Sequence, residues 1–227
     1  MTTENLPVLA IIGGTGDLGT GLARRWAQAG YEVIIGSRTL EKAEAAVADL
    51  REVMAERGVS EVTVQAMSNA DAAAAAEIVT LTVPFSHQVS TLESVRDALQ
   101  GKILIDVTVP LVPPRVARVQ LPPEGSAGQI AQELLGEEVA VVSAFQNVAA
   151  AHLQEGKGVE CDVLVSGNKK DARQQVIKLV EAAGMRGFHA GMINNAAAAE
   201  ALTSVLIAIN KQYGCHAGIK ISGLGDA

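Results

Sequence analysis

Residues 8–19 read VLAIIGGTGDLG, five apolar residues followed by a glycine-rich turn. Gly14, Gly16 and Gly19 supply the pattern G-x-G-x-x-G. A buried strand that ends in this pattern and leads into a helix is typical of dinucleotide-binding proteins. Gly14 permits the tight turn, Gly16 lets a pyrophosphate approach the backbone, and Gly19 lets the helix pack on the strand. The free N–H groups and the dipole of a helix that starts at Asp17 then favour phosphate binding.

The second predicted strand is residues 32–35. The residues that follow it indicate which dinucleotide binds. NAD-dependent proteins place Asp or Glu there, to bond the ribose 2′-hydroxyl. Here the strand is followed by Gly36, Ser37 and Arg38, with no acidic residue. A guanidinium can bind a phosphate through two hydrogen bonds. Ser37 can donate a further bond and Lys42 can add positive charge, so we predict NADP.

Apolar runs of strand length alternate with longer mixed segments in the first half of the chain. The predicted strands are 8–12, 32–35, 62–67, 78–83 and 103–107, and the predicted helices are 17–29, 40–57, a short Ala-rich helix capped by Asn69, and 87–99. This alternation predicts right-handed crossovers and a parallel sheet. The expected fold class is α/β, with a Rossmann-type doubly wound and mostly parallel sheet.

The second half departs from this alternation. Five of the seven prolines lie between Val109 and Glu124, which predicts a long loop because proline is excluded from helix interiors and central strands. Regular structure is predicted to resume with a helix at 126–135, strands at 139–145 and 161–166, a helix at 170–183, and a helix from Asn194 or Asn195 to Tyr213. We expect an NADP-binding domain in residues 1–150 and a smaller C-terminal α/β domain in residues 151–227.

The composition limits the classes of partner. Acidic residues outnumber Lys and Arg by 25 to 18, a formal charge of −7, and such a chain is a poor candidate for nucleic-acid binding. The apolar run 201–209 is too short to span a bilayer, and the N-terminus does not read as a signal peptide. Cys161 and Cys215 lie far apart in no metal-ligand spacing, so we expect reduced thiols, no metal site and a cytoplasmic protein.

Beyond these motifs, residues along nearly the whole chain match one protein family. The sequence resembles the coenzyme F420-dependent NADP oxidoreductases, also called NADPH-dependent F420 reductases. The likeness lies in residues 13–23, Gly36-Ser37-Arg38 with Lys42, Thr82-Val83-Pro84, residues 110–113, Ser126-Ala127, residues 141–145 and residues 218–220. It implies a deazaflavin, coenzyme F420, in a cleft that the C-terminal domain closes, and a homodimer to which that domain contributes. Thr15, Ser37, Arg38 and Lys42 match the family's NADP contacts.

Hydride transfer between a nicotinamide and a deazaflavin is chemistry that the two cofactors supply themselves. No residue is therefore predicted to be catalytic with certainty, and the candidates are His87 and Asn147. The remaining contacts are expected at the ends of strands. The predicted cofactor-binding residues are Gly14, Thr15, Gly16, Asp17, Leu18, Gly19, Ser37, Arg38, Lys42, Val83, Pro84, Phe85, His87, Thr108, Val109, Pro110, Gln146 and Asn147.

Two departures from the family pattern keep other functions open. Some members have His where this chain has Gln146, and Trp where it has Phe85. One alternative is an NADPH-dependent reductase of another acceptor, namely a flavin, a quinone or a ferric chelate. A second alternative, from another class, is a non-catalytic NADP-sensing protein.

Overall fold

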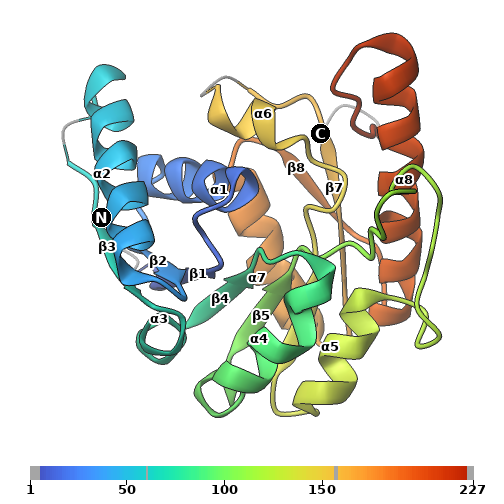
Figure 1. Ribbon diagram of the computed structural model, residues 1–227, viewed down its shortest axis with the longest axis horizontal. Coiled ribbons are helices and arrows are strands. Elements are labelled where there is room, and N and C mark those ends of the chain that lie inside the picture. Colours follow the sequence, from blue (N-terminus) through green and yellow to red (C-terminus); the bar gives the residue numbers. More distant parts are fainter. Residues whose placement is uncertain (1–5, 60, 156–157, 224–227) are drawn as a thin grey trace.

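The structure is a computed structural model that describes residues 6–59, 61–155 and 158–223. Its centre is an eight-stranded sheet in the order β3-β2-β1-β4-β5-β6-β7-β8 (Figure 1). The strands are β1 Leu9–Ile12, β2 Val33–Ser37, β3 Val64–Ser68, β4 Ile78–Leu81, β5 Ile103–Asp106, β6 Ala140–Ser143, β7 Asp162–Gly167 and β8 Arg186–His189. All neighbours pair in parallel except β6 and β7, which are antiparallel. The predicted α/β class with a mostly parallel sheet is confirmed.

Helices cover both faces of the sheet (Figure 1). They are α1 Asp17–Gln28, α2 Leu40–Glu56, α3 Asn69–Ala75, α4 Gln88–Val95, α5 Ala127–Leu135, α6 Ala150–Gln154, α7 Lys170–Ala182 and α8 Ala196–Tyr213. One buried cluster joins α1, α2, α6 and α7 to the sheet, and the other joins α3, α4, α5 and the start of α8 to its opposite face. Residues on both sides of position 150 therefore share each core.

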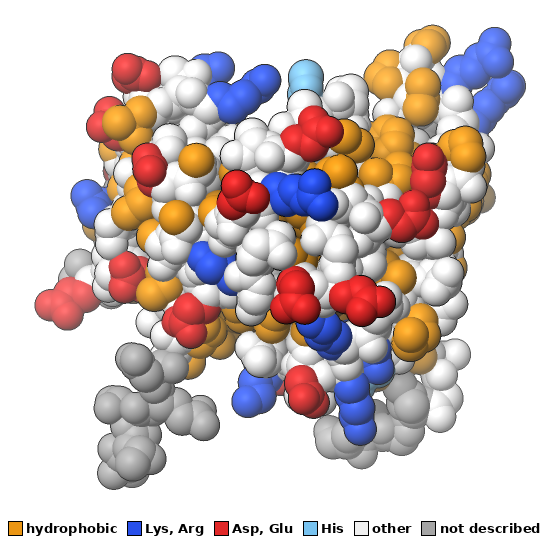
Figure 2. Space-filling model, turned by 90° about the horizontal axis from the view of Figure 1, so that it is seen from below, with side chains coloured by type: hydrophobic (Ala, Val, Ile, Leu, Met, Phe, Trp, Pro, Cys, Tyr) orange, Lys and Arg blue, Asp and Glu red, His pale blue; other side chains and the backbone are white. Residues whose placement is uncertain are grey.

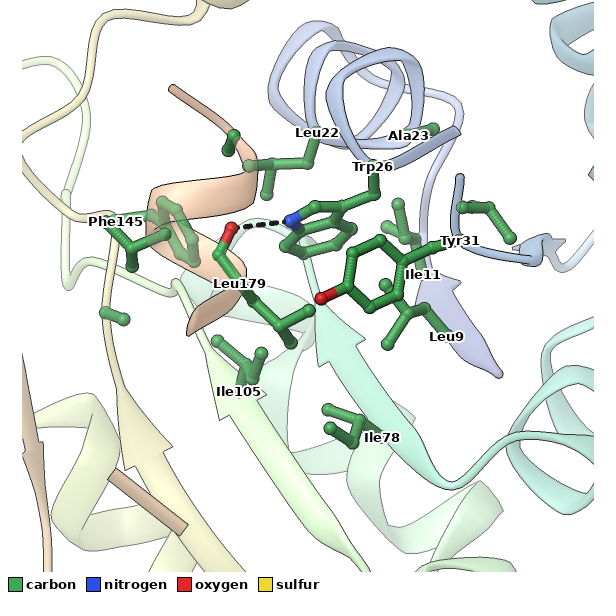
Figure 3. Packing of buried hydrophobic residues seen from close by; sticks show 14 of the residues in the cluster. Leu9, Ile11, Leu22, Ala23, Trp26, Tyr31, Ile78, Ile105, Phe145 and Leu179 are labelled. Carbon is green, nitrogen blue, oxygen red and sulfur yellow. Dashed lines mark hydrogen bonds between the residues drawn. The ribbon is translucent and has the colours of Figure 1, made fainter. Parts of the chain in front are cut away.

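Trp26 lies at the middle of the first cluster (Figure 3). Its indole Nε1 donates to the backbone carbonyl of Leu179 at 2.9 Å, which satisfies a buried donor. The ring meets Phe145 edge to face, with centroids 6.0 Å apart. Because Trp26 lies on α1, Leu179 on α7 and Phe145 just after β6, this one side chain joins the N-terminal and C-terminal parts of the chain.

The structure corrects several predicted elements. Strand β8 and helix α6 were not predicted, and the single helix expected over 87–99 is divided into α4 with a short 3₁₀ turn on either side. Ser68, not Asn69, caps α3, since its Oγ accepts from the backbone N–H of Asp71 at 3.2 Å. Residues 107–126, all described, contain no helix or strand, as the prolines indicate.

Strands β7 and β8 continue the sheet that the Rossmann strands begin. Val142 and Ser143 of β6 pair with Gly167 and Ser166 of β7. The division into domains at residue 150 stays a prediction. Cys161 is buried, Cys215 is exposed, and both are free thiols.

Figure 2 shows the face seen from below the view of Figure 1. Basic and acidic side chains are interspersed over it, without a continuous basic area. Nucleic-acid-binding proteins use such a continuous area. None of the helices in the described part of the chain has the length and apolar character that a membrane span requires.

Candidate functional site

A cleft of about 700 Å³ opens where strands β1, β2, β4 and β5 end. Ligands of open α/β sheets bind at this edge, outside the carboxyl ends of the strands. All but four of the predicted site residues line it: Thr15, Gly16, Asp17, Leu18, Gly19, Ser37, Arg38, Lys42, Val83, Pro84, Phe85, His87, Thr108 and Val109. All residues recorded along this cleft lie between Gly13 and Val116. Closure of the cleft by residues 151–227 stays a prediction.

The glycine loop has the shape that a pyrophosphate requires. A Cβ at Gly14 would lie 2.7 Å from the carbonyl oxygen of Ile11, and one at Gly19 would lie 2.7 Å from the Cα of Gly14. Neither position has room for a side chain. A Cβ at Gly16 would meet no heavy atom within 4 Å, so this position faces open space. Gly16 is also the N-cap of α1, and no side chain caps the helix, which leaves its first N–H groups for an anion.

The end of β2 presents the residues predicted to read the 2′-phosphate. Ser37 is buried as the last residue of the strand, and its Oγ accepts from the backbone N–H of Thr39 at 3.2 Å. Its hydroxyl proton stays available to a ligand. Arg38 and Lys42 are exposed on the cleft rim. Neither forms a hydrogen bond or ion pair within the described part of the chain, so both cations are available to a phosphate.

The part of the cleft beside the ends of β4 and β5 is more apolar than the part beside the end of β2. Val83, Pro84 and Phe85 follow β4, and Val109 follows β5, while His87 stands exposed on the rim. The proline-rich loop adds Leu111, Pro113 and Val116. Side chains of this kind suit the faces of planar rings and keep water out.

Gln146 and Asn147 do not line the cleft, contrary to what their place at a strand end suggests. The amide Nε2 of Gln146 donates to the carbonyl oxygen of Asp106 and to Ser143 Oγ, each at 2.8 Å. The amide Nδ2 of Asn147 donates to the carbonyl oxygen of Ala199 at 2.8 Å and to Thr203 Oγ1 at 3.1 Å. Both amides are buried and hold β6 to neighbouring elements.

Gly14 and Pro110 are likewise absent from the cleft wall, since both are buried behind it. Nine residues outside the predicted site set also line it, namely Gly13, Thr39, Asn69, Thr82, Thr91, Val107, Leu111, Pro113 and Val116. Asn69 Oδ1 accepts from the backbone N–H of Gly13 at 3.3 Å and so holds the start of the glycine loop. Its signal in the sequence was weak, because a polar residue at a helix start reads as a cap.

Thr108 lines the cleft, and behind it lies a cluster of buried polar side chains that includes Gln88, Asp106 and Glu200. Asp106 Oδ1 accepts from the backbone N–H of Thr108 at 2.9 Å, and Oδ2 accepts from Gln88 Nε2 at 2.5 Å. Burial raises the pKa of Asp106, while these hydrogen bonds from Thr108 and Gln88 lower it. Glu200 of α8 accepts from the backbone N–H groups of Ala127 and Gly128.

The pKa of Glu200 is raised to about 8, mainly because the group is buried; the two backbone hydrogen bonds oppose this rise and the nearby Asp106 adds to it. Gln88 Oε1 and Gln146 Oε1 are buried without a hydrogen-bond donor in the described part of the chain. Acceptors therefore outnumber donors around this cluster. That imbalance favours a proton on one of the two carboxyl groups.

Helix α6 packs against the N-terminal end of α1, where the pyrophosphate is predicted to bind. Gln154 Nε2 donates to the carbonyl oxygen of Asp17 at 2.6 Å and to Thr20 Oγ1 at 2.8 Å. Arg25 donates to the carbonyl oxygens of Leu153 and His152, the natural place for a cation at a helix C-terminus. The segment after β6 is therefore coupled to the glycine loop.

Comparisons with known proteins agree with this geometry. Residues 8–110 match the family model described as NADP oxidoreductase, coenzyme F420-dependent. The F420-dependent NADP reductase of Methanocaldococcus jannaschii is 39% identical over 222 residues, which cover 95% of this chain and 98% of that protein. The F420-dependent NADP reductase of Methanothermobacter thermautotrophicus is 41% identical over 225 residues, 96% of each chain.

A solved structure agrees over a similar span. The crystal structure of a protein from Arthrobacter sp. FB24, assigned as an F420-dependent NADP reductase, superposes with a TM-score of 0.80. The two sequences are 27% identical, and the match covers 96% of this chain and 100% of the other. On the shared fold and the full-length matches, this chain belongs to the F420-dependent NADP oxidoreductase family.

Proposed function

We propose that this chain transfers a hydride between NADP(H) and coenzyme F420. The observation that carries the proposal is one continuous cleft that joins Gly16 and Arg38 at one end to Val83 and Val109 at the other. The first end suits a pyrophosphate and a 2′-phosphate, and the second suits two stacked rings. The relatives that match over almost their whole length are F420-dependent NADP reductases.

The protein's part in the reaction is binding and orientation. The N-terminus of α1 with Gly16 would hold the pyrophosphate, and Arg38, Ser37 and Lys42 would hold the 2′-phosphate. Val83 to Phe85 would support the nicotinamide, and Thr108 and Val109 would support the deazaflavin. When both are bound, NADPH gives its C4 hydride to C5 of the deazaflavin and one proton is taken up, which yields NADP⁺ and reduced F420.

Fixing the two rings at near-attack distance, on the order of 3–3.5 Å, removes an entropic barrier, and the apolar walls keep water away. This chemistry requires no metal. No group of three or more His, Cys, Asp or Glu within the described residues could hold one. His87 stays a candidate for a contact near the nicotinamide, because it lies exposed on the rim. Asn147 is better explained as a structural residue.

We also propose that the protein is a homodimer through α8. Val205, Ile209 and Tyr213 are spaced four residues apart on this helix, and their side chains are 43%, 36% and 75% exposed. Residues with that spacing share one helix face. An exposed apolar stripe of this kind is typical of a protein–protein contact. Light scattering after size exclusion should report twice the chain mass, and Ile209→Lys should lower it.

The test of the activity is the loss of the 420 nm absorbance of F420 when NADPH is added, compared with FMN, a quinone and ferric citrate. Reduction of F420, with no reduction of the other three acceptors, supports the proposal. Turnover of one of the other acceptors supports an alternative reductase. Binding of NADPH with no turnover of any acceptor points to a sensor.

A further inference from the structure

The proline-rich loop between β5 and α5 carries two arginines next to the cleft. Residues 109–123 contain Arg115 and Arg118 and no acidic residue, in a chain whose formal charge is −7. Val116, between the two arginines, lines the cleft together with Leu111 and Pro113 of the same loop. The loop therefore offers apolar side chains to the cleft and positive charge beside it.

The loop backbone holds both arginines in consecutive turns. The N–H of Arg115 donates to the carbonyl oxygen of Val112 at 3.1 Å, and the N–H of Arg118 donates to that of Arg115 at 3.0 Å. Gln120 Nε2 donates to the carbonyl oxygens of Val112 and Arg115, at 3.3 and 3.2 Å. The loop thus has a fixed shape without help from either guanidinium group.

Both guanidinium groups are available to an outside partner. Arg115 and Arg118 are exposed, and within the described residues neither side chain forms a hydrogen bond or an ion pair. Arg24, by contrast, pairs with Asp49, and Arg186 pairs with Asp162 at 2.8 Å. Two unpaired cations beside an apolar ring site suit a ligand that has a planar ring and an anionic chain.

We propose that Arg115 and Arg118 bind the anionic side chain of the deazaflavin coenzyme. In F420 this side chain carries a phosphodiester and glutamate carboxylates, whereas the deazariboflavin that lacks them ends in a neutral ribityl chain. Arg38 and Lys42 lie at the opposite end of the same cleft. The two pairs of cations would therefore hold one anionic end of each cofactor, with the rings between them. This inference rests on the proposed function.

The experiment compares two acceptors, F420 and the deazariboflavin without phosphate or glutamate, in the double variant R115Q/R118Q. We expect the KM for F420 to rise about 2- to 30-fold, the range that two exposed ion pairs produce. The KM for the deazariboflavin and the KM for NADPH should not change. Added NaCl should raise the KM for F420 in the original protein and have less effect in the variant, because salt screens exposed charges.

The matched control is R96Q/K170Q, which removes two exposed positive charges from positions outside the cleft. It should leave the KM for F420 unchanged. A KM for F420 that does not change in R115Q/R118Q overturns the inference. An equal rise in the KM for the deazariboflavin also overturns it, since the loop would then act through its shape alone. If the original protein reduces neither acceptor, the proposed function itself fails.

Discussion

The carboxylate of Glu200 accepts a hydrogen bond from the backbone N–H of Gly128 at 3.0 Å, and so joins α8 to the first turn of α5. The same carboxylate accepts from Ala127 N–H at 2.7 Å, while Gln88 Nε2 donates to the carbonyl oxygen of Ala127 at 2.9 Å. Gln88 also bonds Asp106 at the end of β5. A chain of buried polar contacts therefore leads from the C-terminal helix to the cleft wall.

The protonation of Glu200 should make stability depend on pH. Burial raises its folded-state pKa to about 8 from an ordinary value of 4.5. Between these values the folded state binds the proton and the unfolded state does not, so stability is greatest near the lower value and falls as pH rises toward 8. We expect the Tm to fall over this range, and to fall less in Glu200→Gln, whose side chain does not titrate.

Thermal unfolding at a series of pH values checks this prediction. Glu61→Gln, which removes an exposed carboxylate, is the control and should keep the slope of the original protein. Equal slopes in Glu200→Gln and the original protein would show that Glu200 is ionised in the folded state throughout.

Two glycines of the phosphate loop should respond differently to alanine. At Gly19 the new Cβ would lie 2.7 Å from Gly14 Cα and 2.9 Å from Thr82 Oγ1, so the backbone must shift. We expect Gly19→Ala to lower both the stability, by about 1–3 kcal/mol, and the affinity for NADPH. At Gly16 the Cβ meets no protein atom within 4 Å, so Gly16→Ala should keep its Tm and lose affinity because it blocks the pyrophosphate.

Urea unfolding and calorimetric titration with NADPH separate the two effects. Unchanged NADPH affinity in Gly16→Ala would mean that the pyrophosphate does not approach this residue.

Gln154 should support NADPH binding from outside the cleft. Its amide holds the carbonyl oxygen of Asp17, the first residue of α1, and the hydroxyl of Thr20. Its Oε1 also accepts from Arg24 on the same helix. Loss of a hydrogen bond of this kind costs about 0.5–1.5 kcal/mol. We expect Gln154→Ala to raise the KM for NADPH several-fold and to leave kcat and the KM for F420 unchanged.

Steady-state kinetics with each substrate varied in turn gives these constants. Gln100→Ala is the control, because among the described residues the Gln100 amide bonds the carbonyl oxygen of Arg96 and no other group. A lower kcat with an unchanged KM for NADPH would contradict the assigned role of Gln154.

The features that the sequence predicts best are local ones. The glycine loop and the Arg38 turn depend on a few adjacent residues and on the strands before them. Strand β8 was missed because RGFH has no apolar alternation. It is held by pairing with β7 and by Arg186, whose guanidinium bonds the carboxylate of Asp162 at 2.9 and 2.8 Å. That partner lies 24 residues earlier.

The direction of the side chains that follow β6 could not be predicted from the sequence either. Asn147 was expected to face a ligand, yet its amide bonds Thr203, a residue 56 positions later. Glu200 gave one signal, a carboxylate in the second turn of an Ala-rich helix. Its role became visible only when folding brought the N-terminus of α5 against it.

Arg38 is expected to bind the 2′-phosphate of NADP(H) during hydride transfer to F420. A charge-assisted hydrogen bond contributes about 1.5–3 kcal/mol, so Arg38→Ala should lower kcat/KM for NADPH about 10- to 150-fold. The value for NADH, which lacks the phosphate, should change little.

The most direct measurement is the ratio of kcat/KM for NADPH to kcat/KM for NADH, followed at 420 nm with F420 as acceptor. We expect a large ratio in the original protein and a much smaller one in Arg38→Ala. A ratio that Arg38→Ala changes by less than about twofold, against the tenfold that corresponds to 1.4 kcal/mol, would contradict the assignment of Arg38 and of this end of the cleft.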